Sequence, residues 1–334
     1  MSLYTKLKAL CSAPSISGRE GKVRDVIKAQ IAPFVDEVSV DTLGNLIALK
    51  KGSVGERKIM LCAHMDEIGF LVNFIEDDGS VRVATIGGID LGAVAYSKVV
   101  SENGTVGVLV PEGKVKPEDY KADKMYIDIG ASSKKEAERK VRIGDFFVAA
   151  PDLSRLSGKR VAGRPIDDRV GCLALIETAE RLSKLKTDTD IYFVFSVQEE
   201  VGCRGSAPAT YAIRPNEAIC VDVTATGDVK GADRMACALG KGVAIKIKDN
   251  SVICHEQLVK ALCGISNENK IPYQKEVLTF GGTDTSSMQL SASGSMAGAL
   301  SIPTRYIHSG VEMCDLGDLE SCIDLLEAYI LARG

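Results

Sequence analysis

The sequence predicts an α/β fold in which a mostly parallel sheet is sandwiched by helices and a small β-barrel-like domain is inserted. After residue 167, strand-like apolar runs alternate with long helical patterns, as expected for parallel strands joined by helical crossovers. Between residues 70 and 163, apolar residues instead alternate or form short runs separated by turn sequences. With 334 residues, 45% of them hydrophobic, the chain exceeds a usual single domain and can bury a large core.

The N-terminal part is expected to contain a helix and three strands. Ser17-Gly-Arg-Glu20 matches a capping box that opens a helix ending near Ala32. Short strands follow at 37–40 and 46–49, and an apolar strand covers 58–63.

A β-rich segment then interrupts this pattern. Turn sequences such as Asp78-Gly79 and Asn103-Gly104 divide residues 70–163 into hairpins. We therefore expect residues 1–69 and 164–334 to form one discontinuous catalytic domain.

Helices and strands alternate again in the C-terminal part. The expected elements are a helix at 170–185, strands near 191, 218, 243 and 297, and a closing helix at 316–331.

Acids and histidines gather at the ends of the predicted strands. The run from Ile191 to Val197 resembles a strand buried on both faces, and it leads into Glu199-Glu200. An isolated acidic pair of this kind is more often a solvated turn, but similar positions elsewhere in the chain also hold metal-ligand residue types. These positions are His64, Asp222 and His308 at strand ends, with Asp167 and Asp168 before a helix. In open α/β sheets, the carboxyl ends of the strands are where ligands bind.

The residue types indicate the kind of site. Imidazole and carboxylate without thiolate are typical of zinc, cobalt or manganese in a hydrolytic site. Two histidines and several carboxylates suit two ions roughly 3.5–4 Å apart, bridged by one carboxylate and one water. Asp66 lies two residues after His64, so it is a candidate to hold the far ring nitrogen of that histidine. We expect two divalent ions per chain, with zinc first and cobalt or manganese as alternatives.

Composition argues against several other classes of function. The formal net charge is −4 and the basic residues are dispersed, which disfavours nucleic acid as a partner. The ten cysteines show no CxxC spacing, so we expect reduced core residues in a cytoplasmic protein, with Cys254 and Cys314 left open as metal ligands. No signal peptide is evident and no apolar run is long enough to span a membrane.

Six short segments, spread over nearly the whole chain, form an ordered set of motifs. They are Ala63–Gly69, Ile166–Gly171, Gln198–Gly205, Val221–Thr224, Gly281–Asp284 and Ile302–Ser309. In this order they resemble the motifs of peptidase family forty-two, the dinuclear-metal aminopeptidases that include glutamyl and deblocking aminopeptidases and the tetrahedral aminopeptidases. Arg164-Pro165 departs from the lysine-containing stretch that is common in that family.

The resemblance implies a division of the ligands between two ions. One ion would be held by His64 and Asp222 and the other by Glu200 and His308, with Asp167 bridging both.

It also implies that Glu199 is the general base and Asp66 the acid that orients a histidine. Glu199 would take a proton from the bridging water and pass it to the leaving amine of a short peptide. Asp168 stays outside the ligand set, because a helix start explains it equally well.

Substrate-binding residues are expected near two further segments. Gly282, Thr283 and Asp284 are predicted either to form a pocket wall or to cap the helix that follows. His255 is predicted to be a first-turn surface histidine, and the resemblance leaves open a place in the pocket wall.

The resemblance further implies a homo-oligomer in which the inserted domain, residues 70–163, is a dimerisation domain, with possible assembly of the dimers into a twelve-subunit tetrahedral shell. Exposed edges of the inserted β domain would give that association a physical motive.

Alternative functions fit the residues less well. A metal-dependent deacylase or carboxypeptidase would use a similar site without requiring a free substrate amine. A glycoside hydrolase needs two facing carboxylates but no histidine-bound metal, and a non-catalytic homologue would not need a complete set of ligands.

Overall fold

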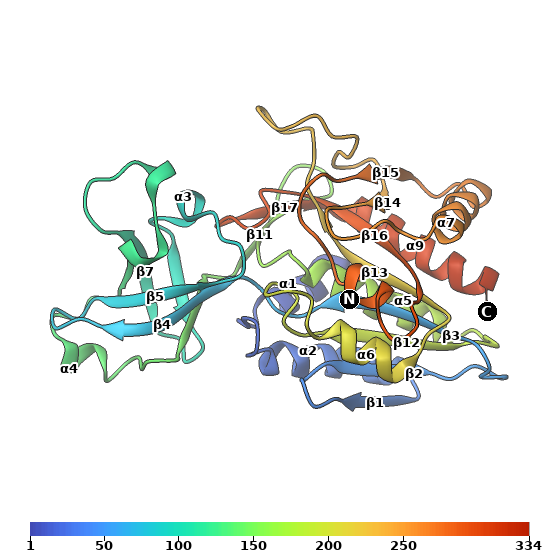
Figure 1. The fold of residues 1–334 in the computed structure, drawn as a ribbon, viewed down its shortest axis with the longest axis horizontal. Helices are drawn as coiled ribbons and strands as arrows, with labels where there is room; N and C mark the ends of the chain where they lie inside the picture. Colours follow the sequence, from blue (N-terminus) through green and yellow to red (C-terminus); the bar gives the residue numbers. More distant parts are fainter. Residues whose placement is uncertain (334) are drawn as a thin grey trace.

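A computed structural model describes residues 1–333, which form two lobes of unequal size (Figure 1). The larger lobe contains one long sheet with strands in the order β1 (Glu37–Val40), β2 (Leu46–Lys50), β12 (Asp190–Ser196), β3 (Lys58–His64), β13 (Glu217–Thr224), β16 (Met296–Arg305), β17 (Glu312–Asp315), β11 (Arg160–Arg164) and β10 (Asp152–Arg155). In addition, β14 (Val243–Lys248) pairs with β16, and β15 (Tyr273–Val277) pairs with β14. The central strands β12, β3, β13 and β16 are parallel. The predicted α/β class is therefore confirmed.

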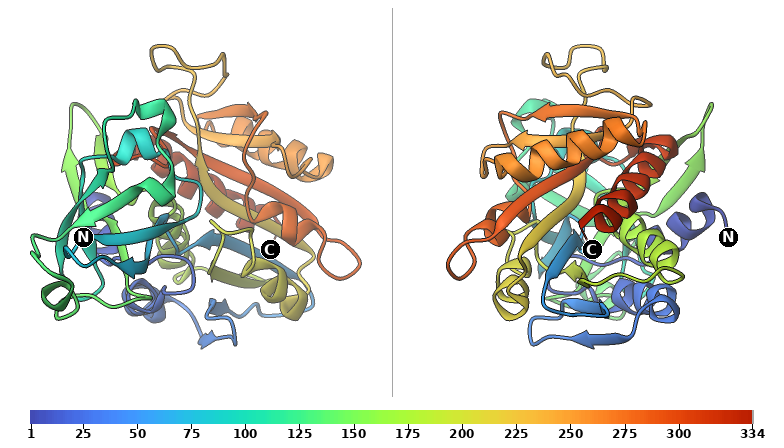
Figure 2. Two further views of the ribbon diagram at one scale, coloured as in Figure 1. Left: turned by 60° about the vertical axis from the view of Figure 1, so that its left-hand side comes forward. Right: turned by 90° about the vertical axis from the view of Figure 1, so that its right-hand side faces the viewer.

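Helices cover both faces of this sheet (Figure 2). One face carries α1 (Leu3–Cys11), α2 (Gly21–Ile31), α5 (Arg169–Leu182), α7 (Glu256–Glu268) and α9 (Leu316–Arg333), and the other carries α6 (Ser206–Ile213) and α8 (Thr285–Gln289). Strand β3 shows why both faces are buried. Ile59 and Leu61 belong to the core under the first group of helices, and Met60 and Cys62 belong to the core under the second. This alternation follows from the two-residue period of a strand.

The smaller lobe is a closed β-barrel, which confirms the β-barrel-like insertion. Its strands follow the order β4 (Gly69–Ile75), β5 (Val81–Ile86), β8 (Met125–Asp128), β7 (Val106–Pro111), β6 (Lys98–Ser101) and β9 (Phe146–Ala149). Short helical turns, α3 (Leu91–Val94) and α4 (Lys134–Ala137) among them, connect the strands. The lobe has a hydrophobic core of its own, separate from the core of the main sheet.

Two expectations about this lobe differ from the structure. The expectation of exposed strand edges was wrong, because closure pairs every barrel strand on both sides. The barrel also ends at Ala149, before the boundary at residue 163 that the sequence predicts. Residues 152–164 instead pair with each other and with β17 as part of the main sheet.

The first predicted helix is confirmed as α2, but its capping box is not formed. The helix begins after Glu20 without a side-chain cap, and Glu20 Oε1 accepts the amides of Gly18 and Gln198. Ser17 Oγ donates to Asp66 Oδ2 at 2.6 Å. The Ser17 hydroxyl is thus held by a charged acceptor away from the helix start and caps no amide of α2.

None of the helices within residues 1–333 combines the length and apolar character that a bilayer crossing requires.

Candidate metal centre

The candidate ligands meet at the carboxyl edge of the parallel strands. His64 is the last residue of β3, and Asp222 lies near the end of β13. Glu200 follows β12, and His308 follows β16. Because these four strands are parallel neighbours, their ends converge. Asp167 reaches the same place from the loop between β11 and α5.

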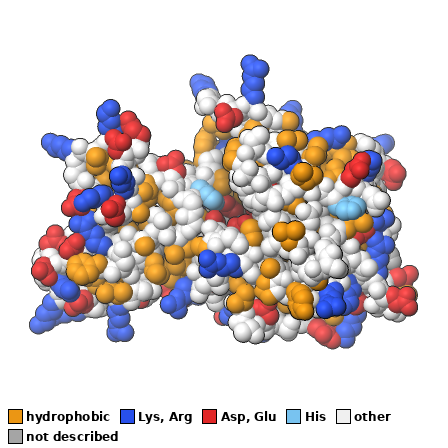
Figure 3. All heavy atoms as spheres, viewed as in Figure 1, with side chains coloured by type: hydrophobic (Ala, Val, Ile, Leu, Met, Phe, Trp, Pro, Cys, Tyr) orange, Lys and Arg blue, Asp and Glu red, His pale blue; other side chains and the backbone are white. Residues whose placement is uncertain are grey.

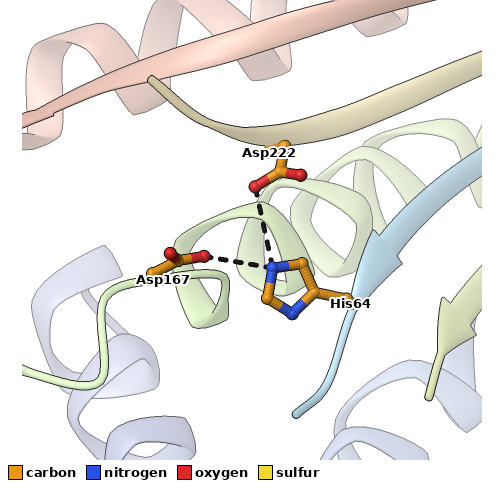
Figure 4. A group of neighbouring side chains, drawn as sticks. All are labelled: His64, Asp167 and Asp222. Atoms are coloured by element: carbon orange, nitrogen blue, oxygen red, sulfur yellow. Dashed lines mark hydrogen bonds and ion pairs between the residues drawn. The ribbon is translucent and has the colours of Figure 1, made fainter. Parts of the chain in front are cut away.

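Asp167 lies between the two histidines. Its Oδ1 is 3.0 Å from His64 Nε2, and its Oδ2 is 3.4 Å from His308 Nε2. Asp222 Oδ1 lies 3.7 Å from His64 Nε2, and Figure 4 shows these side chains pointing toward one another. Glu200 Oε2 lies 3.2 Å from His308 Nε2. Each oxygen of Asp167 thus faces a different imidazole.

Two groups of donor atoms result. His64, Asp167 and Asp222 form one group, and Asp167, Glu200 and His308 form the other, each with donor atoms within 4.8 Å of one another. Asp167 belongs to both groups, as a bridging ligand would.

Charge and burial at the centre fit divalent cations. Burial would raise the pKa of Asp167, but the neighbouring His308 and His64 outweigh that effect and lower it. Burial raises the pKa of Glu200 and of Asp222. The buried Oε1 of Glu200 has no hydrogen-bond partner among residues 1–333. The three close carboxylates and two imidazoles form a donor set that suits two metal ions, and Oε1 of Glu200 keeps its lone pairs without a hydrogen bond.

Asp66 holds the turn that carries the two glutamates. Its Oδ1 accepts the amide of Glu199 at 3.0 Å, and its Oδ2 accepts the amide of Glu200 at 3.2 Å. The far ring nitrogen of His64 lies 3.0 Å from the backbone oxygen of Asp66 and 3.7 Å from its carboxylate. The backbone of Asp66 is therefore the closer partner of the imidazole, not the side chain that the spacing predicts.

Glu199 lies beside the candidate ligands and lines the cavity over the centre. Its carboxylate accepts a hydrogen bond from Cys203 Sγ at 3.2 Å. Burial raises the pKa of Glu199 well above its usual range, and the neighbouring acids add to this effect. A raised pKa favours proton uptake.

Asp168 is a helix cap, which confirms the helix-start interpretation. Its Oδ1 accepts the amide of Gly171 in the first turn of α5 at 3.0 Å. Its Oδ2 accepts the amide of His64 at 3.3 Å.

A cavity of about 680 Å³ lies over the metal centre. In the space-filling view, a histidine and acidic side chains show in the hollow between the two lobes (Figure 3). The cavity lining is largely apolar and includes Val229, Ala232, Leu278, Phe280 and Ile307.

The predicted substrate-binding residues divide into two pairs. Gly282 and Thr283 line the cavity, and a Cβ on Gly282 would lie 2.7 Å from Ser251 Oγ, so a larger residue here would displace the Ser251 side chain. Asp284 is buried beneath, where its carboxylate accepts hydrogen bonds from Ser196 and Ser206. His255 precedes α7 and does not belong to the cavity wall described by residues 1–333.

Sequence reasoning missed two charged side chains near the centre, Lys246 and Glu312. Lys246 lines the cavity although it is buried, and it pairs with Glu276 at 2.6 Å. In the sequence, Lys246 is recognisable only as a charged residue within the apolar run 243–248. Glu312 contacts the backbone of the two segments that carry Asp167 and His308. In the sequence, it is recognisable only as an acid four residues after His308.

Comparison with known proteins agrees with this geometry. A sequence profile described as M42 glutamyl aminopeptidase matches residues 44–325. The lysyl aminopeptidase of Pyrococcus furiosus is 36% identical, with 97% of this chain and 95% of that protein covered. An aminopeptidase from the archaeon Desulfurococcus kamchatkensis superposes with a TM-score of 0.94 at 38% identity, covering 98% of this chain and 94% of the other. The TET1 peptidase of Pyrococcus horikoshii, which can assemble into a tetrahedron or a large octahedral shell, gives 0.87 at 38% identity, covering 98% and 99%.

Proposed function

The chain is an aminopeptidase of the M42 glutamyl aminopeptidase family, and we propose that it removes N-terminal residues from short peptides with two divalent ions and Glu199 as general base. The observation that supports this most directly is Asp167, whose two oxygens face His64 and His308 at 3.0 and 3.4 Å. A single carboxylate placed in this way suits a bridge between two ions.

We assign the ions to the two donor groups. His64 and Asp222 would hold one ion, Glu200 and His308 the other, and Asp167 both. Bound there, the ions would polarise the substrate carbonyl and lower the pKa of the attacking water. Zinc is the first candidate, with cobalt and manganese as alternatives for the same ligand types.

Glu199 moves the proton in this proposal. Its carboxylate lines the same cavity as the ligands, and Asp66 fixes the backbone of the turn that carries it. Oε2 of Glu199 would take the proton of the attacking water while Cys203 holds Oε1. Glu199 would then return the proton to the leaving amine.

The remaining cavity is proposed to bind the peptide. The wall around Leu278 and Phe280 would contact the first side chain, and the backbone at Gly282 and Thr283 would lie along the chain. The free amine at the N-terminus would lie against the metal centre, which explains cleavage from that end.

We further propose that the chain forms a homo-oligomer in the cytoplasm, with the barrel joining subunits. The support is the assembly described for the Pyrococcus horikoshii peptidase and the free state of all ten cysteines, which suits a reducing compartment.

The test is hydrolysis of a peptide panel by protein reconstituted with zinc, cobalt or manganese, comparing free and acetylated N-termini. We expect release of one residue at a time from free termini, loss of activity with a chelator, and recovery when metal is restored. Equal cleavage of acetylated peptides would instead indicate a deacylase or an endopeptidase. Activity that persists after complete metal removal would contradict the proposal.

A further inference from the structure

One buried carboxylate outside the ligand set contacts both sides of the metal centre. Glu312 is the first residue of β17, which lies between β16 and β11 in the sheet. The chain that leaves β16 carries His308, and the chain that leaves β11 carries Asp167. The position of Glu312 in the sheet therefore places it between these two ligand segments.

Its two oxygens are divided between the two segments. Oε2 accepts the amide of Ile166 at 2.7 Å and the amide of Asp167 at 3.0 Å. Oε1 lies 3.4 Å from the amide of His308, which donates to it. Arg164 donates to Oε1 at 3.2 Å and to the backbone oxygen of Ser309 at 2.8 Å.

The charge of Glu312 is balanced within a closed cluster. Arg164 also lies 3.8 Å from Glu67, which lies 3.4 Å from Arg169. All four side chains are at most 2% exposed. Two positive and two negative groups make the cluster neutral, so removing the charge of Glu312 alone leaves an unpaired positive charge in the interior.

We propose that Glu312 is a positioning residue for the metal centre, which sets the spacing of Asp167 and His308 by holding the backbone of both. This inference rests on the proposed two-metal function. Ligand spacing matters here because Asp167 must reach both ions while His308 reaches one, and outer partners of ligands typically change metal affinity 10- to 100-fold when altered.

The substitution Glu312→Gln tests this role with little change of shape. Glutamine offers one carbonyl oxygen in place of two carboxylate oxygens, and its NH2 group would face other donors on one side. It therefore cannot accept from both ligand segments. Glu312→Asp keeps the charge and both acceptor oxygens but shortens the side chain by one methylene, so it should weaken metal binding less than Glu312→Gln does.

The measurement is calorimetric titration of metal-free protein with Zn²⁺, together with thermal unfolding of the metal-free state. We expect wild type to bind two ions and Glu312→Gln to bind at least one of them about 10- to 100-fold more weakly. The Zn²⁺ affinity of Glu312→Asp should lie between those of wild type and Glu312→Gln. Excess Zn²⁺ should restore peptide hydrolysis to Glu312→Gln.

The matched control is Glu217→Gln. Glu217 is also buried and pairs with two arginines, Arg57 and Arg333, but it lies at the opposite end of β13 from Asp222. This variant should lose stability and keep wild-type affinity for both ions.

The outcomes separate the two proposals. Binding of fewer than two ions by wild type would refute the proposed function itself. Two ions in wild type and equal affinity in Glu312→Gln, even with a lower melting temperature, would overturn the positioning role. If Glu312→Gln does not fold, Arg164→Lys decides, because a single ammonium cannot replace both the Nη1 contacts with Glu312 and Ser309 and the Nη2 contact with Glu67. Unchanged affinity in that variant would also overturn the role.

Discussion

Asp66 connects the candidate ligands to the proposed general base through the backbone. Its carboxylate binds the amides of Glu199 and Glu200, and its own carbonyl lies beside the ring of His64. The adjacent glutamates can therefore take different roles on one turn, because their side chains contact different partners. Glu200 turns to His308, and Glu199 turns to Cys203 and the cavity.

The first prediction concerns Glu199. Glu199→Gln should bind both ions and lose about 10²- to 10⁴-fold in kcat, because the amide keeps the shape of the side chain but cannot take a proton. Metal content and peptide hydrolysis measured on the same preparation test this prediction. The companion variant Glu200→Gln should lose metal as well as activity. Turnover near the wild-type rate in Glu199→Gln would remove Glu199 as the base.

At the scale of elements, Glu217 ties the last helix to the sheet. It is the first residue of β13, and its side chain accepts hydrogen bonds from Tyr329 at 2.7 Å, from Arg57 at 2.6 Å and from Arg333. Tyr329 and Arg333 belong to the C-terminal turns of α9. A single carboxylate thus fixes the end of that helix.

The second prediction follows from this contact. Burial would raise the pKa of Glu217, but Arg333, Tyr329 and Arg57 outweigh it and lower the pKa. Its stabilising contribution is therefore fully present above the unfolded-state pKa of about 4.3 and is lost as the pH falls through the lower folded-state value. Glu217→Gln should reduce the free energy of unfolding by about 1–3 kcal/mol at pH 7. Urea unfolding of both proteins at pH 7 and at pH 3 tests this prediction. A difference in the free energy of unfolding between wild type and Glu217→Gln that is as large at pH 3 as at pH 7 would contradict it.

Periodicity and strand ends predicted most of the main sheet and the residues gathered at its edge. The run at 191–197 and the strand at 58–63 are long, apolar and bounded by polar residues, so few other structures fit them. Asp167, His64, Asp222 and His308 converge because parallel neighbours end at one edge.

Contacts between distant segments could not be predicted in the same way. Ser17 matches a capping box locally, but folding brings it to Asp66, a charged acceptor 49 residues away, to which its hydroxyl donates. Glu312 depends on the order of β16, β17 and β11 in the sheet, which no local pattern reveals. Barrel closure likewise depends on pairing β4 with β9, whose sequences are far apart.

At the scale of the whole molecule, the barrel lobe takes part in the site. Gly87 and Gly88 follow β5, and a Cβ on them would lie 3.3 Å from Glu200 Oε2 and 3.4 Å from His308 Nδ1 respectively. The amide of Asp90 donates to the backbone oxygen of His308 at 3.3 Å. The donor group of Asp167, Glu200 and His308 therefore lies at the junction of the lobes, so a movement of the barrel would change the positions of Glu200 and His308.

The third prediction concerns assembly through the barrel. Because the barrel is closed, association cannot proceed by pairing of strand edges and must use side chains on its outer surface. Val106 and Val108 point outward from β7 and are 56% and 36% exposed. We expect the wild-type chain to scatter light as a multiple of its own mass, and Val106→Asp combined with Val108→Asp to shift that mass downward, because charge in an apolar contact is costly.

Val40→Asp combined with Val54→Asp provides the matched control for this experiment. Both valines are exposed on the larger lobe, so these substitutions add the same charge away from the barrel and should leave the mass unchanged. A wild-type mass equal to one chain would contradict oligomer formation altogether. An oligomer that withstands the two β7 substitutions, while the folded state is retained by circular dichroism, would place the contact on another face of the barrel. A lower mass in the β7 variant, with an unchanged mass in the control, would place the contact between subunits at or near β7.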